Sequence, residues 1–236
     1  MNISMNPNSE LKQSVVSIPD IVQVPDDLVH QAREFQEAIM MYSCAIREVK
    51  TKLEVLNDEL SVRNQRNPIE MIKSRVKKPL SIVEKLHRKN LPITLDSMVN
   101  YLDDVAGIRV ICSFVDDTYT VARMLVSQDD IRVIAVKDYI ENPKENGYRS
   151  YHLIVEVPVF FSDRKKDMRV EVQIRTIAMD FWASLDHQLK YKKDIGDAAG
   201  SIGAELKKCA DVIAKTDRHM LVIRKSIEAQ RRTVRQ

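Results

Sequence analysis

Glu171-Val172-Gln173-Ile174-Arg175-Thr176 alternates polar and apolar side chains, a pattern typical of a β-strand. Successive side chains of a strand point to opposite faces, so Val172 and Ile174 share one face and the polar side chains share the other. A strand with such a polar face is either half exposed to solvent or lines a cleft. This stretch alone leaves both interpretations open.

Four runs rich in β-branched residues have the length of strands, and they lie at 108–115, 131–139, 152–161 and 168–175. The segment 116–126 has the composition of a helix. Strand, helix and strand, followed by a hairpin between the last two runs, predict a mixed sheet. We therefore expect an α/β (α+β) fold, with helices around a mixed β-sheet.

The segment before these strands is expected to be helical. Asn67 is a candidate N-cap, a proline occupies the first helical position, and Glu70 is placed to close a capping box. The sequence predicts a helix from this point to about residue 87. Pro79 is a place where that helix kinks or restarts.

Two shorter helices are expected on either side of the strand region. Thr94 or Asp96 caps a helix that reaches residue 103 or 104. A second helix is expected over 177–192, and it carries the only tryptophan, Trp182.

A long helix is predicted over residues 27–66. Its apolar residues follow one another in alternating steps of four and three from Leu28 to Leu60. Residues 1–26 before it are rich in Ser, Asn and Pro, and we expect a partly disordered leader there.

The same spacing returns in the last segment, 196–236, between Ile202 and Ile227. Three glycines mark a loose joint before it: Gly196, Gly200 and Gly203. A stripe this narrow needs a partner. Either the two terminal helices pack on each other or on the core, or they join subunits of an oligomer.

Composition excludes several classes of protein. With 37 Lys+Arg against 34 Asp+Glu, the net charge of +3 gives no general attraction to nucleic acid or membranes. The 3 cysteines are far apart and lack CxxC spacing, which argues against a zinc site or a disulfide framework. No run of about 18 apolar residues is present, and the first residues do not resemble a signal peptide. We expect a cytoplasmic protein.

A cationic stripe is predicted on the helix after Asn67. At 100° per residue, one side gathers apolar residues and the other gathers a hydroxyl and three cations, namely Lys77, Ser81, Lys85 and Arg88. Such a stripe is either a cradle for a triphosphate or an ordinary solvated face.

Asp104 stands just before the first strand, in Asp103-Asp104-Val105-Ala106-Gly107-Ile108-Arg109. A carboxylate in this place is suited to Mg²⁺, a hard cation that binds oxygen ligands together with phosphates. The alternative is a helix C-terminus with Gly107 as its turn residue and Arg109 as a surface cation.

Tyr148 directly follows the turn signal Asn146-Gly147. An exposed tyrosine between cations suits a purine base, because stacking contributes about 1–3 kcal/mol per base. The alternative is a tyrosine packed over the rim of a hairpin. The nearby polar side chains are Lys137, Lys144 and His152.

In this order the motifs resemble the (p)ppGpp synthetase family, which has a RelA/SpoT-like synthetase domain, and the chain length resembles its small alarmone synthetases. The matching region runs from about 67 to 192 and contains Asn67-Pro-Ile-Glu70, the cationic segment 75–88, Asp104-Val-Ala-Gly-Ile-Arg109, Asn142-Pro-Lys-Glu-Asn-Gly-Tyr-Arg-Ser150 and Glu171-Val-Gln-Ile-Arg-Thr176. Tyr151 departs from the Leu or Ile that is usual in this family.

The resemblance implies a nucleotidyltransferase-like domain over 67–195 and transfer of pyrophosphate from ATP to the ribose 3′-OH of GDP or GTP, leaving AMP. It implies an ATP site of Arg75 and Arg109 around the adenine, with Lys77, Ser81, Lys85 and Arg88 on the phosphates. It implies that Asp104 and Glu171 hold Mg²⁺ and that Glu171 activates the 3′-OH. It also implies that Tyr148 stacks on guanine, with Lys137, Lys144, His152 and Gln173 around the acceptor nucleotide.

Bifunctional members of the family carry a His-Asp hydrolase domain before this region, where this sequence has only the striped helix. We therefore expect synthesis without hydrolysis. The resemblance also favours a homo-oligomer, a tetramer joined through the terminal helices, to which a product or RNA is an open candidate as an allosteric ligand. Two alternatives are a catalytically silent nucleotide- or RNA-binding regulator and a nucleotidyltransferase that transfers NMP.

Overall fold

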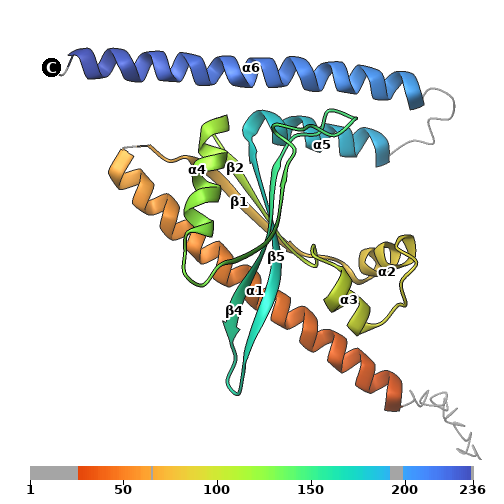
Figure 1. The fold of residues 1–236 in the computed structure, drawn as a ribbon. Helices are drawn as coiled ribbons and strands as arrows, with labels where there is room; N and C mark the ends of the chain where they lie inside the picture. Colours follow the sequence, from red (N-terminus) through yellow and green to blue (C-terminus); the bar gives the residue numbers. More distant parts are fainter. Residues whose placement is uncertain (1–25, 65, 192–198, 235–236) are drawn as a thin grey trace, which may run out of the picture.

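The computed structural model describes residues 26–64, 66–191 and 199–234 (Figure 1). The elements in chain order are α1 Asp26–Asn64, β1 Ile69–Val76, α2 Pro79–Arg88, α3 Leu95–Tyr101, β2 Ala106–Cys112, α4 Val115–Val126, β3 Arg132–Asp138, β4 Tyr151–Phe160, β5 Lys165–Thr176, α5 Ile177–Tyr191 and α6 Ala199–Val234. No helix among these described residues combines the length and the hydrophobicity needed to cross a membrane.

The strands form one sheet in the order β1-β2-β5-β4-β3. The central pair, β2 and β5, is parallel, and the other pairs are antiparallel. The parallel pair requires a long crossover connection, and α4, β3 and β4 supply it. The expected α/β fold with a mixed sheet and long terminal helices is confirmed.

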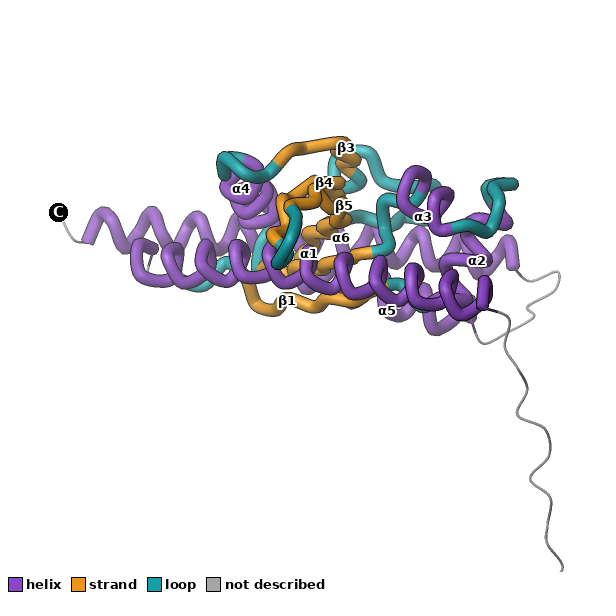
Figure 2. The backbone as a smooth tube through the Cα atoms, turned by 90° about the horizontal axis from the view of Figure 1, so that it is seen from below, coloured by secondary structure: helices purple, strands orange, loops and turns teal. Residues whose placement is uncertain are grey.

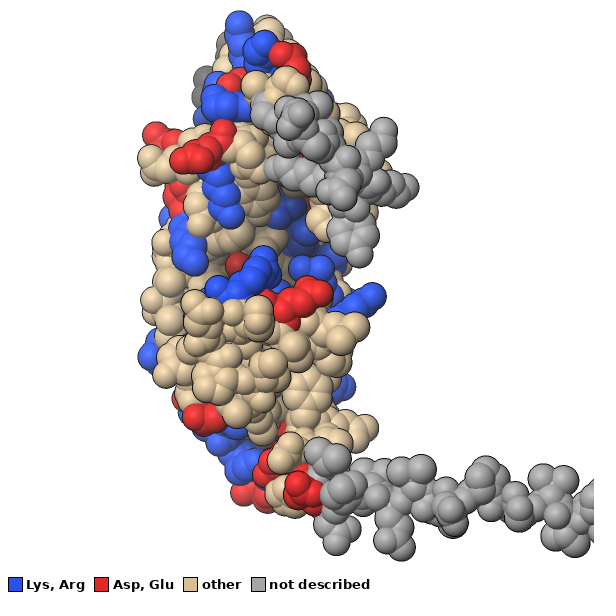
Figure 3. All heavy atoms as spheres, turned by 90° about the vertical axis from the view of Figure 1, so that its right-hand side faces the viewer, with Lys and Arg blue, Asp and Glu red and all other residues tan. Residues whose placement is uncertain are grey.

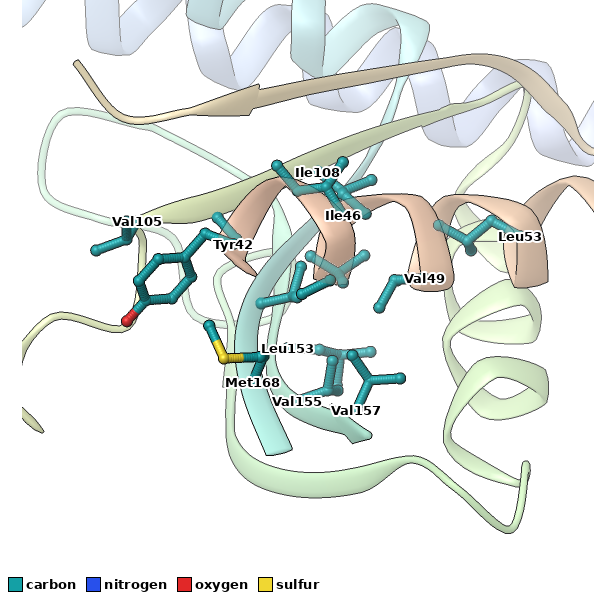
Figure 4. Packing of buried hydrophobic residues seen from close by; sticks show 14 of the residues in the cluster. Tyr42, Ile46, Val49, Leu53, Val105, Ile108, Leu153, Val155, Val157 and Met168 are labelled. Carbon is teal, nitrogen blue, oxygen red and sulfur yellow. The ribbon is translucent and has the colours of Figure 1, made fainter. Parts of the chain in front are cut away.

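Helix α1 lies along one face of the sheet. Its residues Ala45, Val49 and Leu53 are fully buried, because steps of four and three keep them on one side of the helix. In Figure 4, Val49 lies over apolar side chains of the sheet, among them Val155 and Val157. The stripe of the N-terminal helix therefore packs on the core of its own chain.

Helices α5 and α6 cover one end of the other face, while α2 and α3 lie together at one end of the molecule (Figures 1 and 2). Helix α6 is fixed by hydrogen bonds: the indole N–H of Trp182 donates to Leu206 O over 2.9 Å, and the Thr176 hydroxyl donates to Asp217 Oδ2 over 2.6 Å. This arrangement leaves part of the polar face of the sheet uncovered.

The C-terminal part of the apolar stripe of α6 is exposed to solvent. The packed side of the helix carries Ala210, Ala214 and Asp217, which are buried. Three residues of the expected stripe are exposed, namely Met220 (52%), Ile223 (43%) and Ile227 (45%). The two terminal helices thus differ, because only the N-terminal stripe is covered within the described chain.

The expected helix from Asn67 is wrong over residues 69–76. This segment is the edge strand β1, paired with β2, and helix α2 begins only at Pro79. A register shift between Ile69 and Met71 sends both Ile69 and Ile72 toward the core, three residues apart as on a helix. The bulge therefore imitates helical spacing.

Other boundaries are closer to expectation. Thr94 caps α3, since its hydroxyl accepts a hydrogen bond from the Ser97 N–H over 3.1 Å, and the helix ends at Tyr101. The expected joint is wrong at Gly200 and Gly203, which lie inside α6. Gly196 and the expected leader up to residue 25 lie outside the described residues.

Candidate functional site

One row of polar side chains crosses the whole sheet on the face opposite α1. The paired positions run from β1 to β3 in the order Lys73, Arg109, Gln173, His152 and Lys137. Residues paired in register point to the same face. The sheet therefore brings together four residues predicted from the sequence and adds Lys73, which the sequence analysis did not select.

The adjacent row runs Arg75, Gly107 and Glu171. Gly107 has no side chain, so the row stays open between the cation and the carboxylate. A cavity of about 190 Å³ lies here, and Arg75, Arg109, Asp104 and Glu171 are among the residues that line it. Figure 3 views the molecule from its α2 side and shows Lys and Arg side chains gathered around a hollow at mid-height.

Asp104 lies between two lysines at this cavity. Its Oδ2 atom is 2.8 Å from Lys77 Nζ and 2.7 Å from Lys85 Nζ. Burial raises the pKa of Asp104, but the hydrogen bonds and charges of the two lysines outweigh it and hold the pKa below its usual value. The second oxygen, Oδ1, is buried and has no hydrogen-bond partner among the described residues.

Glu171 is also held in its charged form. Its Oε2 accepts a hydrogen bond from the Gln173 amide over 2.8 Å, and its Oε1 lies 3.3 Å from His152 Nδ1. Burial raises the pKa of Glu171, and the contacts with His152 and Gln173 more than offset it, so the pKa is lowered.

The donor set at the cavity fits Mg²⁺ that arrives with a nucleotide. Among the residues described here, no group of three or more His, Cys, Asp or Glu side chains is placed to hold a metal by itself. Asp104 and Glu171 line the same cavity, and Mg²⁺ is usually bound by one or two carboxylates together with substrate phosphates and water. The free Oδ1 of Asp104 matches that requirement.

Tyr148 lies beside His152 of the first row. Arg175 Nη2 donates to the Tyr148 hydroxyl over 2.5 Å, and this hydroxyl lies 2.9 Å from His152 Nε2. These contacts are satisfied together when the imidazole proton is on Nδ1 and faces Glu171. Lys144 Nζ lies 5.0 Å from the centroid of the Tyr148 ring, so a base that stacks on that face has to displace it.

The expected cationic helix face is partly wrong. Lys77 precedes α2, and Arg75 belongs to β1. Lys77 and Lys85 meet at Asp104, whereas Ser81 and Arg88 lie on α2 and are not among the residues that line the cavity. Pro79 explains the difference, because the helix starts at this residue and the earlier cations do not share its phase.

Asp180 was missed by the sequence analysis. It lies in the first turn of α5, and its Oδ1 is 3.2 Å from Arg175 Nη1 and 3.3 Å from Arg109 Nη1. Its position depends on the continuation of β5 directly into α5 at Ile177. The sequence does contain a signal for Asp180, because this acidic residue follows shortly after Arg175-Thr176 at the end of the predicted strand.

Comparison with known proteins identifies the family of the chain. A family model described as "Region found in RelA / SpoT proteins" matches residues 74–196. The GTP pyrophosphokinase YwaC of Bacillus subtilis is 43% identical over 203 residues, which cover 86% of this chain and 96% of YwaC.

Solved structures are similar to the chain over most of its length. The small alarmone synthetase 1 of Bacillus subtilis bound to its product pppGpp superposes with a TM-score of 0.75 at 35% identity, covering 83% of this chain and 99% of that one. The same synthetase bound to AMPCPP gives a TM-score of 0.70 at 34% identity, with 84% and 99% covered. The chain belongs to the RelA/SpoT family and, within it, to the small alarmone synthetases.

Proposed function

We propose that this chain is an Mg²⁺-dependent GTP pyrophosphokinase that transfers pyrophosphate from ATP to the ribose 3′-OH of GDP or GTP and releases AMP. The observation that carries the proposal is the pair of charged carboxylates, Asp104 and Glu171, at one cavity with Lys77 and Lys85 beside it. The relative named GTP pyrophosphokinase and the neighbours bound to pppGpp and AMPCPP support it.

The ATP side of the site is assigned to β1, β2 and α2. Arg75 and Arg109 line the cavity from two adjacent strands, and this supports their assignment to the adenine. Lys77 and Lys85 neutralise Asp104 in the free protein and are within reach of phosphates beside it. Ser81 and Arg88 remain predicted phosphate ligands on the helix that carries Lys85.

Asp104 and Glu171 would hold the Mg²⁺ ion. Bound there, Mg²⁺ neutralises charge that develops on the phosphate oxygens. Asp104 contributes a carboxylate that is ionised at neutral pH, with one oxygen free of protein partners.

The acceptor side is assigned to β5, β4 and β3. Tyr148 offers its ring to guanine, and Lys137, Lys144, His152 and Gln173 surround the nucleotide. Glu171 accepts the proton of the 3′-OH, and its lowered pKa makes it a weak base that is fully ionised at neutral pH. Phosphoryl transfer depends mainly on positioning and charge neutralisation, which suits a weak base.

Incubation of the purified protein with ATP, GDP and Mg²⁺ tests the proposal. AMP and a 3′-pyrophosphorylated guanosine nucleotide are expected on a nucleotide chromatogram. ADP as the product would mean transfer of the γ-phosphate alone, and free pyrophosphate would mean transfer of NMP. Tight binding without turnover would favour the silent regulator.

We propose further that the protein is a cytoplasmic homo-oligomer, a tetramer by resemblance, and acts as a synthetase only. The exposed residues Met220, Ile223 and Ile227 on α6 support an interface at the terminal helix, because apolar side chains in one stripe are costly to leave in water. Light scattering of wild type and Met220→Glu reports assembly. Incubation with the guanosine product should release no pyrophosphate.

A further inference from the structure

Asp180 is surrounded by cations from three neighbouring strands. Its Oδ1 lies 3.2 Å from Arg175 Nη1 of β5 and 3.3 Å from Arg109 Nη1 of β2, and its Oδ2 lies 4.0 Å from Lys73 Nζ of β1. The Asp180 side chain is only 14% exposed. One carboxylate on α5 therefore lies within 4.0 Å of three positively charged groups of the sheet.

Two of these cations belong to the cavity on the ATP side. Arg109 and Lys73 both line it, and they are paired across β1 and β2. Their contacts with Asp180 limit the positions that their long side chains take up.

The third cation, Arg175, leads to the acceptor side. Its Nη2 donates to the Tyr148 hydroxyl over 2.5 Å and to Gln173 Oε1 over 2.7 Å. The amide of Gln173 in turn donates to Glu171. A continuous set of polar contacts thus joins Arg109 to Tyr148 and Glu171, and Asp180 is the member that connects its two halves.

The charges explain why a carboxylate is needed at this point. The Arg175 side chain is 4% exposed, and burial together with nearby Arg109 lowers its pKa, while Tyr148 and Asp180 act against this. Removal of one partner from a buried ion pair leaves an uncompensated charge. Without Asp180 the two guanidinium groups repel each other and lose their common acceptor.

We propose that Asp180 is a positioning residue that couples the two nucleotide subsites, by holding Arg109 on the ATP side and, through Arg175, Tyr148 on the acceptor side. The inference rests on the function proposed above for the same site. It assigns a role to a side chain that does not itself line the cavity.

Calorimetric titration with a non-hydrolysable ATP analogue and with GDP tests this role in wild type and Asp180→Asn. We expect both affinities to fall by about tenfold, because each guanidinium loses a charged hydrogen-bond partner. Asp167→Asn is the matched control, since Asp167 is 53% exposed at the β4–β5 hairpin and forms an ion pair with the nearby Lys165 at 3.6 Å. Unchanged affinities in Asp180→Asn, or a loss for one nucleotide alone, would overturn the inference.

Kinetics separate positioning from general loss of structure. Asp180→Asn should raise KM for both substrates more than it lowers kcat, whereas a purely structural role would lower the melting temperature and leave both KM values of the folded protein unchanged. If Asp180→Asn fails to fold, Asp180→Glu keeps the charge and displaces the carboxylate, and both affinities should again fall together. Wild-type affinities in folded Asp180→Glu would then refute the role.

The two proposals fail in different ways. Wild-type protein that binds both nucleotides but forms no AMP would refute the pyrophosphokinase and leave the role of Asp180 in binding intact. Normal AMP formation by wild type, with unchanged affinities in Asp180→Asn, would refute only the role of Asp180.

Discussion

His152 lies between Tyr148 and Glu171, with Nδ1 at 3.3 Å from Glu171 Oε1 and Nε2 at 2.9 Å from the Tyr148 hydroxyl. The side chain proposed to accept a proton and the ring proposed to hold the base are therefore positioned by the same imidazole. His152 itself is buried, with 7% of its surface exposed, so its orientation is set by these contacts rather than by solvent.

Glu171→Gln should reduce kcat by about 10²–10⁴-fold, the range typical of a lost general base. Binding of GDP should change little, because the amide keeps the shape of the side chain and its place beside Gln173. Single-turnover AMP formation and GDP titration measure the two effects separately. Near-normal turnover in Glu171→Gln would show that another group activates the 3′-OH.

His152→Ala should move the acid limb of the kcat/KM profile to higher pH. Glu171 has a lowered pKa in the folded protein, so its charge, and the stability that this charge contributes, are present at neutral pH and are lost as the pH falls through the folded pKa. Burial raises the pKa of Glu171, and His152 lowers it. Removal of His152 should therefore raise the pKa of Glu171.

The control for this experiment is His30→Ala, since the His30 side chain is 71% exposed on α1. Its pH profile should match that of wild type. An acid limb that stays in place in His152→Ala would mean that Glu171 does not control it.

Lys85→Met should change metal binding in the absence of nucleotide. Lys85 lies 2.7 Å from Asp104 Oδ2 and competes for the carboxylate. Its removal should strengthen Mn²⁺ binding to the free protein by about tenfold, because a neighbouring positive charge disfavours a cation at the same carboxylate. The same variant should bind the ATP analogue more weakly.

Electron paramagnetic resonance of free Mn²⁺ measures this effect. Lys208→Met is a suitable control, because Lys208 is 72% exposed and forms an ion pair with Glu205 on its own helix, α6. Weaker Mn²⁺ binding in Lys85→Met would contradict the competition.

Gly147→Ala should destabilise the protein by about 1–3 kcal/mol, the usual cost of overpacking. Gly147 has φ of 88°, and a Cβ added to it would lie 2.5 Å from the Cβ of Ala210. The preceding turn and α6 would have to separate, which also displaces Tyr148.

Gly203→Ala is the matched control in urea unfolding. Gly203 lies inside α6, and an added Cβ would meet nothing within 4 Å. Alanine should therefore stabilise the helix by about 0.8–1.0 kcal/mol. Equal effects of the two substitutions would contradict the close contact at Ala210.

Much of the sheet could be predicted from the sequence because its central strands carry regular patterns. Alternation identified β5, and runs of β-branched residues located β2, β3 and β4 within a few residues. β1 was predicted as a helix, because a bulge near Ile69 places apolar residues three apart. Such a bulge depends on pairing with β2, which lies more than 30 residues later in the sequence.

In the candidate site, too, some residues could be predicted from the sequence and others depend on the fold. Asp104, Glu171, Tyr148 and Gln173 stand in recognisable motifs, and strand pairing places Gln173 and Glu171 in two adjacent rows of the sheet. The place of Asp180 depends on the direction in which α5 leaves β5, and sequence spacing does not contain that direction. The phase of Lys77 depends on where α2 begins.

The row through Arg75, Gly107 and Glu171 sets the distance between two residues of the proposed site. Neighbouring strands are held about 4.7–4.9 Å apart by backbone hydrogen bonds, and Gly107 fills the interval between cation and carboxylate with backbone alone. The separation between Arg75, proposed to bind ATP, and Glu171, proposed to activate the 3′-OH, is therefore set by backbone pairing in the sheet.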